Sequence, residues 1–215
     1  MPTPRLQLVI GDKAWSSWSL RPWLALQRLG IAFEEISVRL RRPGTAKEIL
    51  AHSPSGKVPA LIVDGAVIWE TLAILEYLAE DHPSLWPADR MARARARAVS
   101  AEMHSGFQAL RQNCQMDFLA RAPRPDLPAE AAADVRRVIA IWRGCRAGHG
   151  TSGPFLFGTF TAADAMFAPV ASRFRTYLPD LGPFGDDGSA GAYVDTIFAM
   201  PEIRRWEAGA RAELA

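Results

Sequence analysis

The stretch that decides the fold reads Val58-Pro59-Ala60-Leu61-Ile62-Val63-Asp64-Gly65-Ala66-Val67-Ile68-Trp69-Glu70-Thr71. Two short apolar runs flank Asp64-Gly65, the dipeptide that most readily adopts the positive φ angles of a tight turn. Residues 60–63 and 66–69 are therefore predicted to form an antiparallel hairpin. Leucines at helical spacing follow from Leu72, so the second strand is expected to lead directly into a helix.

Both ends of this hairpin carry groups that a peptide ligand can use. A proline is tolerated at a strand start, and a cis bond at Pro59 would turn the backbone of Val58 outward to pair with an extended peptide. Glu70 offers a carboxylate to an ammonium group. The N–H and hydroxyl of Thr71 lie at a predicted helix N-terminus, which favours an anion.

The segments before the hairpin complete an α/β unit. Residues 6–10 are β-prone, residues 17–29 follow a helical pattern, and residues 33–40 alternate as a second strand. A helix that connects two such strands of one sheet makes them parallel. With a short helix at 45–52, the predicted order is βαβ-α-ββα.

The remainder of the chain is predicted to be all-helical. Residues 82–89 include two prolines and break the helical periodicity, so we predict a linker there between domains at 1–81 and 90–215. One long helix is expected from Asp89 to about Phe118. A second is expected over 129–146.

Later helices follow a capping motif and a loop. Thr161 and Asp164 have the spacing of a capping box, so Asp164 is expected to be structural rather than catalytic. Residues 182–191 are predicted to form a loop, followed by a last helical segment through Trp206.

Composition narrows the function classes. The 215 residues are 49% hydrophobic with a net charge of +2, and arginines are spread among acids and alanines, which argues against nucleic-acid binding. No apolar run approaches the length of a membrane span or a signal peptide, so we expect no membrane association. Cys114 and Cys145 are far apart, which argues against a disulfide framework or a zinc site and fits a reducing cytoplasm.

The hairpin motif and the Gly158-x-x-Thr161-x-x-Asp164 motif resemble those of the glutathione S-transferase family. The resemblance implies a thioredoxin-like first domain, an all-helical second domain, glutathione as co-substrate, no metal, a homodimer and a role in detoxification. It assigns the backbone of Val58, which precedes Pro59, to the cysteinyl part of glutathione. It assigns Glu70 and Thr71 to the γ-glutamyl group and Lys57 to the glycyl carboxylate.

The thiol chemistry is expected in the loop before the first helix. Ser16-Ser17-Trp18-Ser19-Leu20-Arg21 resembles the Ser-Ser-x-x-x-Arg loop of zeta-like bacterial members, in which the first serine activates the thiol. The resemblance therefore implies Ser16 as the activating residue, with Ser17 as the alternate. A hydroxyl at a helix N-terminus can donate to a thiolate and lower its pKa. The chain departs from the zeta pattern at Trp18, where cysteine is usual, and at Pro22, where valine is usual.

The function implied is an enzyme, a glutathione transferase that conjugates glutathione to a small electrophile. One alternative is a glutathione-dependent cis–trans isomerase of the maleylacetoacetate type, and another is a non-catalytic interaction protein on the same fold. The second substrate is expected against the long helix, at Met103, His104, Phe107 and Arg111, where apolar and cationic groups recur at helical spacing.

Overall fold

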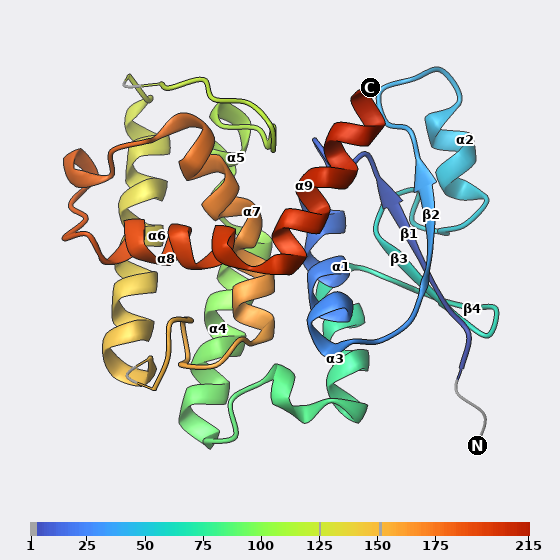
Figure 1. Cartoon of the computed structure of the whole chain (residues 1–215), viewed down its shortest axis with the longest axis horizontal. Helices are drawn as coiled ribbons and strands as arrows, with labels where there is room; N and C mark the ends of the chain where they lie inside the picture. Colours follow the sequence, from blue (N-terminus) through green and yellow to red (C-terminus); the bar gives the residue numbers. More distant parts are fainter. Residues whose placement is uncertain (1–3, 125, 151) are drawn as a thin grey trace.

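The structure is a computed structural model that describes residues 4–124, 126–150 and 152–215. The chain begins with an α/β unit (Figure 1). Its elements are β1 (Leu6–Gly11), α1 (Ser17–Leu29), β2 (Glu34–Val38), α2 (Thr45–Leu50), β3 (Ala60–Val63), β4 (Ala66–Trp69) and α3 (Thr71–Asp81). The predicted order βαβ-α-ββα is confirmed.

The four strands form one sheet in the order β2-β1-β3-β4. β1 pairs in parallel with β2 and antiparallel with β3, while β3 and β4 form the predicted hairpin. Asp64 and Gly65 both have positive φ, at 48° and 92°, as the tight turn requires. α1 and α3 cover the face that carries Leu8 and Ile10, and Ile49 of α2 packs on the opposite face. This arrangement is a thioredoxin-like domain.

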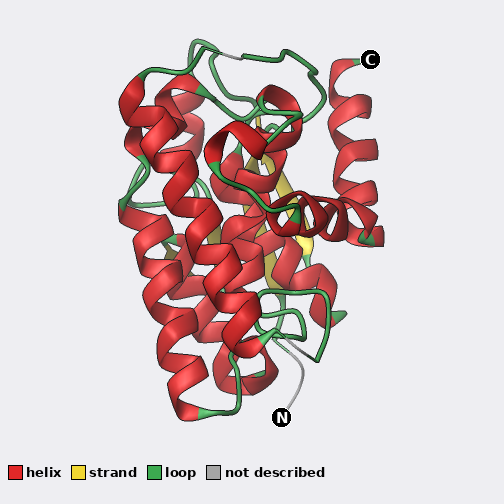
Figure 2. Ribbon diagram, turned by 90° about the vertical axis from the view of Figure 1, so that its left-hand side faces the viewer, coloured by secondary structure: helices red, strands yellow, loops and turns green. Residues whose placement is uncertain are grey.

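The second part of the chain is helical and stands in front of the sheet in the view of Figure 2. A short 3-10 turn (Pro83–Leu85) leads into it. Its elements are α4 (Arg90–Ser105), α5 (Gln108–Asn113), α6 (Ala129–His149), α7 (Ala162–Tyr177), a 3-10 turn (Gly182–Phe184), α8 (Ser189–Ala199) and α9 (Pro201–Leu214). The last helical segment is thus two helices, and α9 extends well beyond Trp206.

The prediction of one long helix from Asp89 to about Phe118 is wrong. α4 ends at Ser105, and Phe107 adopts a left-handed conformation with φ 58° before α5 begins. Asp134 of α6 stabilises this break, because its Oδ2 accepts a hydrogen bond from the Leu110 N–H at 2.9 Å. Periodicity continued through the break, so apolar spacing alone did not reveal it.

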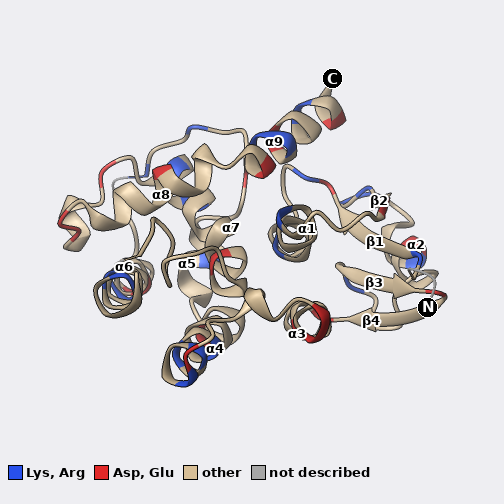
Figure 3. Ribbon diagram, turned by 60° about the horizontal axis from the view of Figure 1, so that its bottom comes forward, with Lys and Arg blue, Asp and Glu red and all other residues tan. Residues whose placement is uncertain are grey.

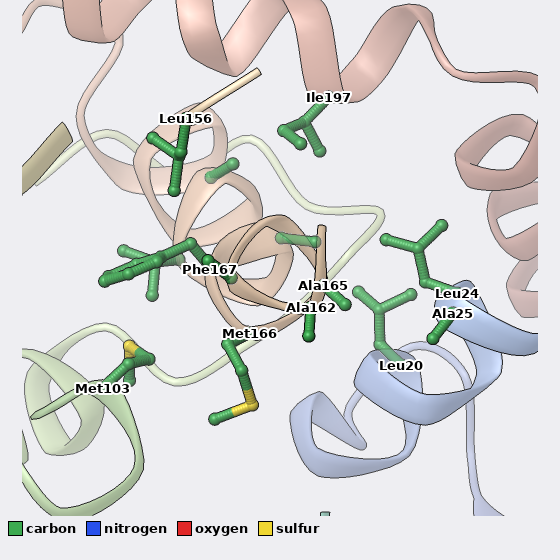
Figure 4. Close-up of a cluster of buried hydrophobic side chains, with 14 of the residues drawn as sticks. Leu20, Leu24, Ala25, Met103, Leu156, Ala162, Ala165, Met166, Phe167 and Ile197 are labelled. Carbon is green, nitrogen blue, oxygen red and sulfur yellow. The ribbon is translucent and has the colours of Figure 1, made fainter. Parts of the chain in front are cut away.

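α7 is the central helix of the molecule, and most of its residues are buried. It packs against α1 of the first domain and against α4, so one apolar cluster runs through both domains (Figure 4). The capping box at its start is present, with Asp164 accepting hydrogen bonds from the backbone and hydroxyl of Thr161. Asp164 also accepts hydrogen bonds from the Leu156 N–H and the Tyr193 O–H. These hydrogen bonds satisfy the buried carboxylate, which therefore has a structural role.

Candidate active site

The serine loop joins β1 to α1. Ser16 is the N-cap residue of α1 and is buried, and its Oγ lies 2.7 Å from Ser19 Oγ. Ser19 Oγ also accepts a hydrogen bond from the Gly11 N–H at 3.0 Å. Ser17 is half-buried and lines a cavity described below. Both candidate hydroxyls therefore lie at the first turn of α1, where unpaired backbone N–H groups give a positive potential.

A cavity of about 360 Å³ opens beside the hairpin, and we call it the hairpin cavity. The predicted residues Lys57, Val58, Pro59 and Glu70 line it together, and the Val58–Pro59 bond is cis. The other residues that line it are Trp18, Ser55, Trp69, His104 and Arg111. The cavity thus combines an apolar wall with cationic and anionic anchors, as a charged peptide ligand requires.

Glu70 has a backbone conformation that side chains rarely adopt, with φ 80° and ψ 126°. Such a conformation costs about 1–3 kcal/mol and is found mostly at functional sites. The carboxylate is half exposed and bridges two groups: Oε1 accepts from the Thr71 N–H at 2.6 Å, and Oε2 lies 3.0 Å from His104 Nε2. The backbone therefore holds the carboxylate at the mouth of the hairpin cavity, where it can accept a further donor.

Thr71 is fully buried, and both of its donors have partners within the chain. Its N–H donates to Glu70, and its hydroxyl makes a long hydrogen bond of 3.5 Å to the Trp18 carbonyl. A ligand carboxylate at this helix N-terminus must therefore compete with Glu70 for the Thr71 N–H.

A second cavity of about 490 Å³ lies between the serine loop and α5, and we call it the arginine cavity. Trp18 and Arg111 line both cavities, so the two share a wall. The remaining lining residues are Trp15, Ser17, Arg41, Gln108, Gln112, Gln115, Met116 and Arg173. No carboxylate belongs to this wall within the described part of the chain.

Four arginines supply the positive charge around the arginine cavity. Arg41, Arg111 and Arg173 line it, and Arg21 packs on Trp18 with its guanidinium carbon 4.1 Å from the ring centroid. None of these four makes an ion pair with a carboxylate among the described residues. Arg21 and Arg173 are buried and donate instead to backbone carbonyls, including those of Met166 and Cys114.

The pKa values of the buried guanidiniums reflect this surplus of charge. Burial lowers the pKa of Arg173 to about 10, with the Arg111 charge as a second cause. Burial also lowers the pKa of Arg21, the nearby Arg173 and Arg111 charges lower it further, and the Glu70 carboxylate offsets part of this lowering. An anion in the arginine cavity would raise the pKa of both arginines again, since a charge of opposite sign favours the charged guanidinium.

The structure separates the four residues expected to contact the second substrate. His104 and Arg111 line the hairpin cavity, and Arg111 also lines the arginine cavity. Met103 and Phe107 are buried in the hydrophobic core instead, and Figure 4 shows Met103 in the central cluster.

Sequence reasoning missed the importance of Trp18, Arg41 and Arg173. The place of Arg173 in a helix rich in apolar residues was a usable signal, because a charged residue is rarely buried without a reason. Arg41 lies in the loop after β2 and gave no such signal. Among the described residues, no His, Cys, Asp and Glu side chains gather in a group that could hold a metal, and no helix is long and apolar enough to span a membrane.

Comparison with known families identifies the chain. Residues 15–81 match the glutathione S-transferase N-terminal domain, and residues 92–209 match the C-terminal domain of the same family. The chain belongs to the glutathione S-transferase family. A glutathione transferase homologue from Burkholderia, solved with bound glutathione, shares the fold with a TM-score of 0.72 at 24% identity, over 97% of this chain and 99% of that one.

Several curated relatives of this family member are isomerases. A maleylacetoacetate isomerase from Rhizobium meliloti is 33% identical over 81% of this chain and 85% of its own length, and the rat enzyme of that name is 30% identical over 78% and 77%. A probable maleylacetoacetate isomerase from Caenorhabditis elegans is 43% identical over 44% of each chain, so that match spans less than half of either protein.

Proposed function

We propose that the protein is a glutathione-dependent enzyme that isomerises the double bond of a small anionic substrate from cis to trans. Glutathione would occupy the hairpin cavity, with its ammonium group on Glu70 and its cysteinyl backbone against Val58. The substrate would occupy the arginine cavity. Ser16, or alternatively Ser17, would stabilise the thiolate at the N-terminus of α1.

The observation that carries this proposal is the set of four guanidiniums that make no ion pair with a carboxylate among the described residues. Removing a charge from water without compensation costs several kcal/mol, and two of these side chains, Arg21 and Arg173, are buried. Such an arrangement is stabilised when a ligand brings negative charge into the cavity. Arginine also binds carboxylates through two parallel hydrogen bonds, which fixes the orientation of a carboxylate substrate.

The shared wall of the two cavities supports the chemistry. Glutathione supplies a thiolate that adds reversibly to one carbon of the double bond, which allows rotation about that bond before the thiolate leaves. Arg111, which faces both cavities, is placed to hold the carboxylate end of the substrate near the thiol. Guanidinium donors also stabilise the negative charge that develops on the substrate when the thiolate adds.

Conjugation is the second candidate, because it begins with the same thiolate. A glutathione S-transferase from Pseudomonas putida is 30% identical to this protein over 67% of the present chain. The polar arginine cavity, which contains three glutamines, favours a charged acceptor over a large apolar one.

The test compares an anionic cis alkene with a neutral electrophile. With glutathione present, we expect catalytic conversion of maleylacetoacetate to its trans isomer without net consumption of glutathione, and slow reaction of a neutral aryl halide. Arg111→Gln should raise the KM for the carboxylate substrate at least tenfold, since a charge-assisted hydrogen bond contributes about 1.5–3 kcal/mol. If glutathione is consumed in proportion to the substrate, the reaction is conjugation rather than isomerisation. Binding of glutathione with neither reaction would favour a non-catalytic protein.

A further inference from the structure

We propose that α9 is a positioning element for the serine loop, because Trp206, Gly209 and Glu213 hold Lys13 and thereby hold the loop that carries Ser16 and Ser17. The proposal rests on the proposed function, since the position of a serine matters only if a serine stabilises the thiolate. In Figure 1, α9 crosses from the helical domain over α1 and ends beside the sheet, near β2.

Lys13 is held by α9 through its backbone and its side chain. Its carbonyl accepts from Trp206 Nε1 at 2.9 Å, and its N–H donates to Glu213 Oε2 at 2.7 Å. Its ammonium, which is only 11% exposed, pairs with Glu35 of β2 and lies 3.8 Å from Glu213 Oε1. Both backbone groups and the side chain of Lys13 are thus fixed by partners distant in sequence.

Gly209 brings α9 against this lysine. A Cβ atom built on Gly209 would lie 2.7 Å from Lys13 Cδ, closer than carbon atoms can approach. The glycine therefore allows the helix and the lysine stem to touch. The aliphatic part of Lys13 packs against Gly209, and any larger residue at position 209 would displace the lysine side chain.

The residues on either side of Lys13 transmit this placement to the serines. The Asp12 carbonyl accepts from the N–H groups of Trp15 and Ser16, at 3.1 and 2.8 Å, which folds the loop into a turn. The Ala14 carbonyl accepts from the Phe118 N–H at 2.9 Å. The loop is thus held by its own turn and by Phe118, and α9 supplies the contacts at Lys13.

The end of α9 is also attached to the second strand. Arg39 donates to the Glu213 carbonyl at 2.7 Å and to Asp12 Oδ1 at 2.8 Å. Asp12 Oδ2 accepts from the Leu40 N–H at 2.6 Å. α9, the loop and the end of β2 therefore form one hydrogen-bonded unit, in which a shift of α9 moves the turn that presents the serines.

Gly209→Ala tests the proposal with the least change to α9 itself. Alanine favours helix over glycine, so this substitution should not unwind the helix, but its methyl group must displace Lys13. We expect kcat to fall by about tenfold, less than the roughly hundredfold loss that a misplacement of about 1 Å can cause. The pKa of the bound glutathione thiol should rise by up to about one unit, with the KM for glutathione unchanged within about twofold.

Gly144→Ala is the matched control. Gly144 also lies inside a helix, α6, and a Cβ there meets only the tip of Arg95 at 4.0 Å. This variant should keep the wild-type kcat and thiol pKa. A variant that merely lowered stability would reduce the active fraction without moving the thiol pKa, so the pKa distinguishes positioning from destabilisation.

A pair of substitutions at Glu213 supplies an independent measurement. Glu213→Gln keeps an oxygen for the Lys13 N–H and should remain near wild type, whereas Glu213→Ala removes it and should behave like Gly209→Ala. Wild-type thiol pKa and kcat in both Gly209→Ala and Glu213→Ala would overturn the role of α9, provided that a serine variant shifts the pKa. An unshifted pKa in Ser16→Ala and in Ser17→Ala would instead overturn serine activation, and the α9 proposal with it.

Discussion

Replacing the serines one at a time should identify the hydroxyl that stabilises the thiolate. Ser19 Oγ already accepts from the Gly11 N–H, so its own proton is available to Ser16 Oγ at 2.7 Å. That leaves the Ser16 proton for a thiolate, at the end of a chain of hydrogen bonds that polarise one another. We therefore expect Ser16→Ala to raise the pKa of bound glutathione. Ser17→Ala should do so instead if the hydroxyl that lines the arginine cavity is the donor.

The size of the effect follows from the loss of one charge-assisted hydrogen bond. Such a bond contributes about 1.5–3 kcal/mol, which corresponds to a pKa rise of roughly one to two units. Turnover at neutral pH should fall about ten- to a hundredfold, and the loss should shrink at higher pH because the solvent then supplies the thiolate. Ser19→Ala should give a smaller shift in the same direction, since it removes only the support for Ser16.

Ultraviolet titration of the bound thiolate measures the pKa directly, and turnover against pH gives an independent value. Glutathione affinity should remain close to wild type, because Glu70 and Val58 still hold the peptide. Ser105→Ala, on the exposed end of α4, is the control for removing a hydroxyl. If neither Ser16→Ala nor Ser17→Ala moves the pKa, the reasoning from the helix N-terminus fails.

Three further predictions concern binding, pH and assembly. Glu70→Gln should weaken glutathione binding by at least tenfold in calorimetry while the unfolding midpoint stays near wild type, and an unchanged affinity would remove Glu70 from the site. Burial raises the pKa of Asp164 to about 6, so the protonated carboxyl contributes fully to stability below about pH 4, and this contribution is lost as the pH rises through 6. Urea unfolding of the wild type should show a loss of up to about 3 kcal/mol over this range, and Asp164→Asn should not show it. The chain should sediment as a homodimer through the hairpin, α3 and α4, where Trp69 and Met91 are exposed, and a monomer at all micromolar concentrations would contradict this.

The proposed dimer surface has a charge pattern that the sequence did not reveal. Figure 3 shows acidic residues on α3 and mostly basic residues on α4. Arg97 of α4 pairs with Glu76 of α3 at 3.0 Å, so this arginine connects the helical part of the chain to the first domain. The pair is exposed and contributes little on its own, about 0–1 kcal/mol.

Local signals predicted the first domain well. Asp64-Gly65 determined the hairpin, and Gly30, with φ 68°, ends α1 where the sequence indicated. The hairpin cavity was predictable for the same reason, because Val58 and Pro59 enter the hairpin and Glu70 leaves it, at fixed distances from the turn. The arginine cavity was not predictable, since Arg41, Arg111 and Arg173 come from three distant segments that only the tertiary fold brings together.

The two departures from the zeta-like loop, Trp18 and Pro22, belong to one arrangement. Pro22 lies inside α1 and has no N–H, so the Trp18 carbonyl four residues earlier has no helical donor. The Thr71 hydroxyl, at the start of α3, lies 3.5 Å from that carbonyl and supplies a weak substitute. The loop after β1 and the helix after the hairpin are thereby linked through Trp18, whose ring contacts His104 on one side and the guanidiniums of Arg21 and Arg111 on others. Because Trp18 lines both cavities, a ligand that moves this ring in one cavity changes the shape of the other. The residue that departs from the zeta-like pattern therefore connects the two sites, together with Arg111.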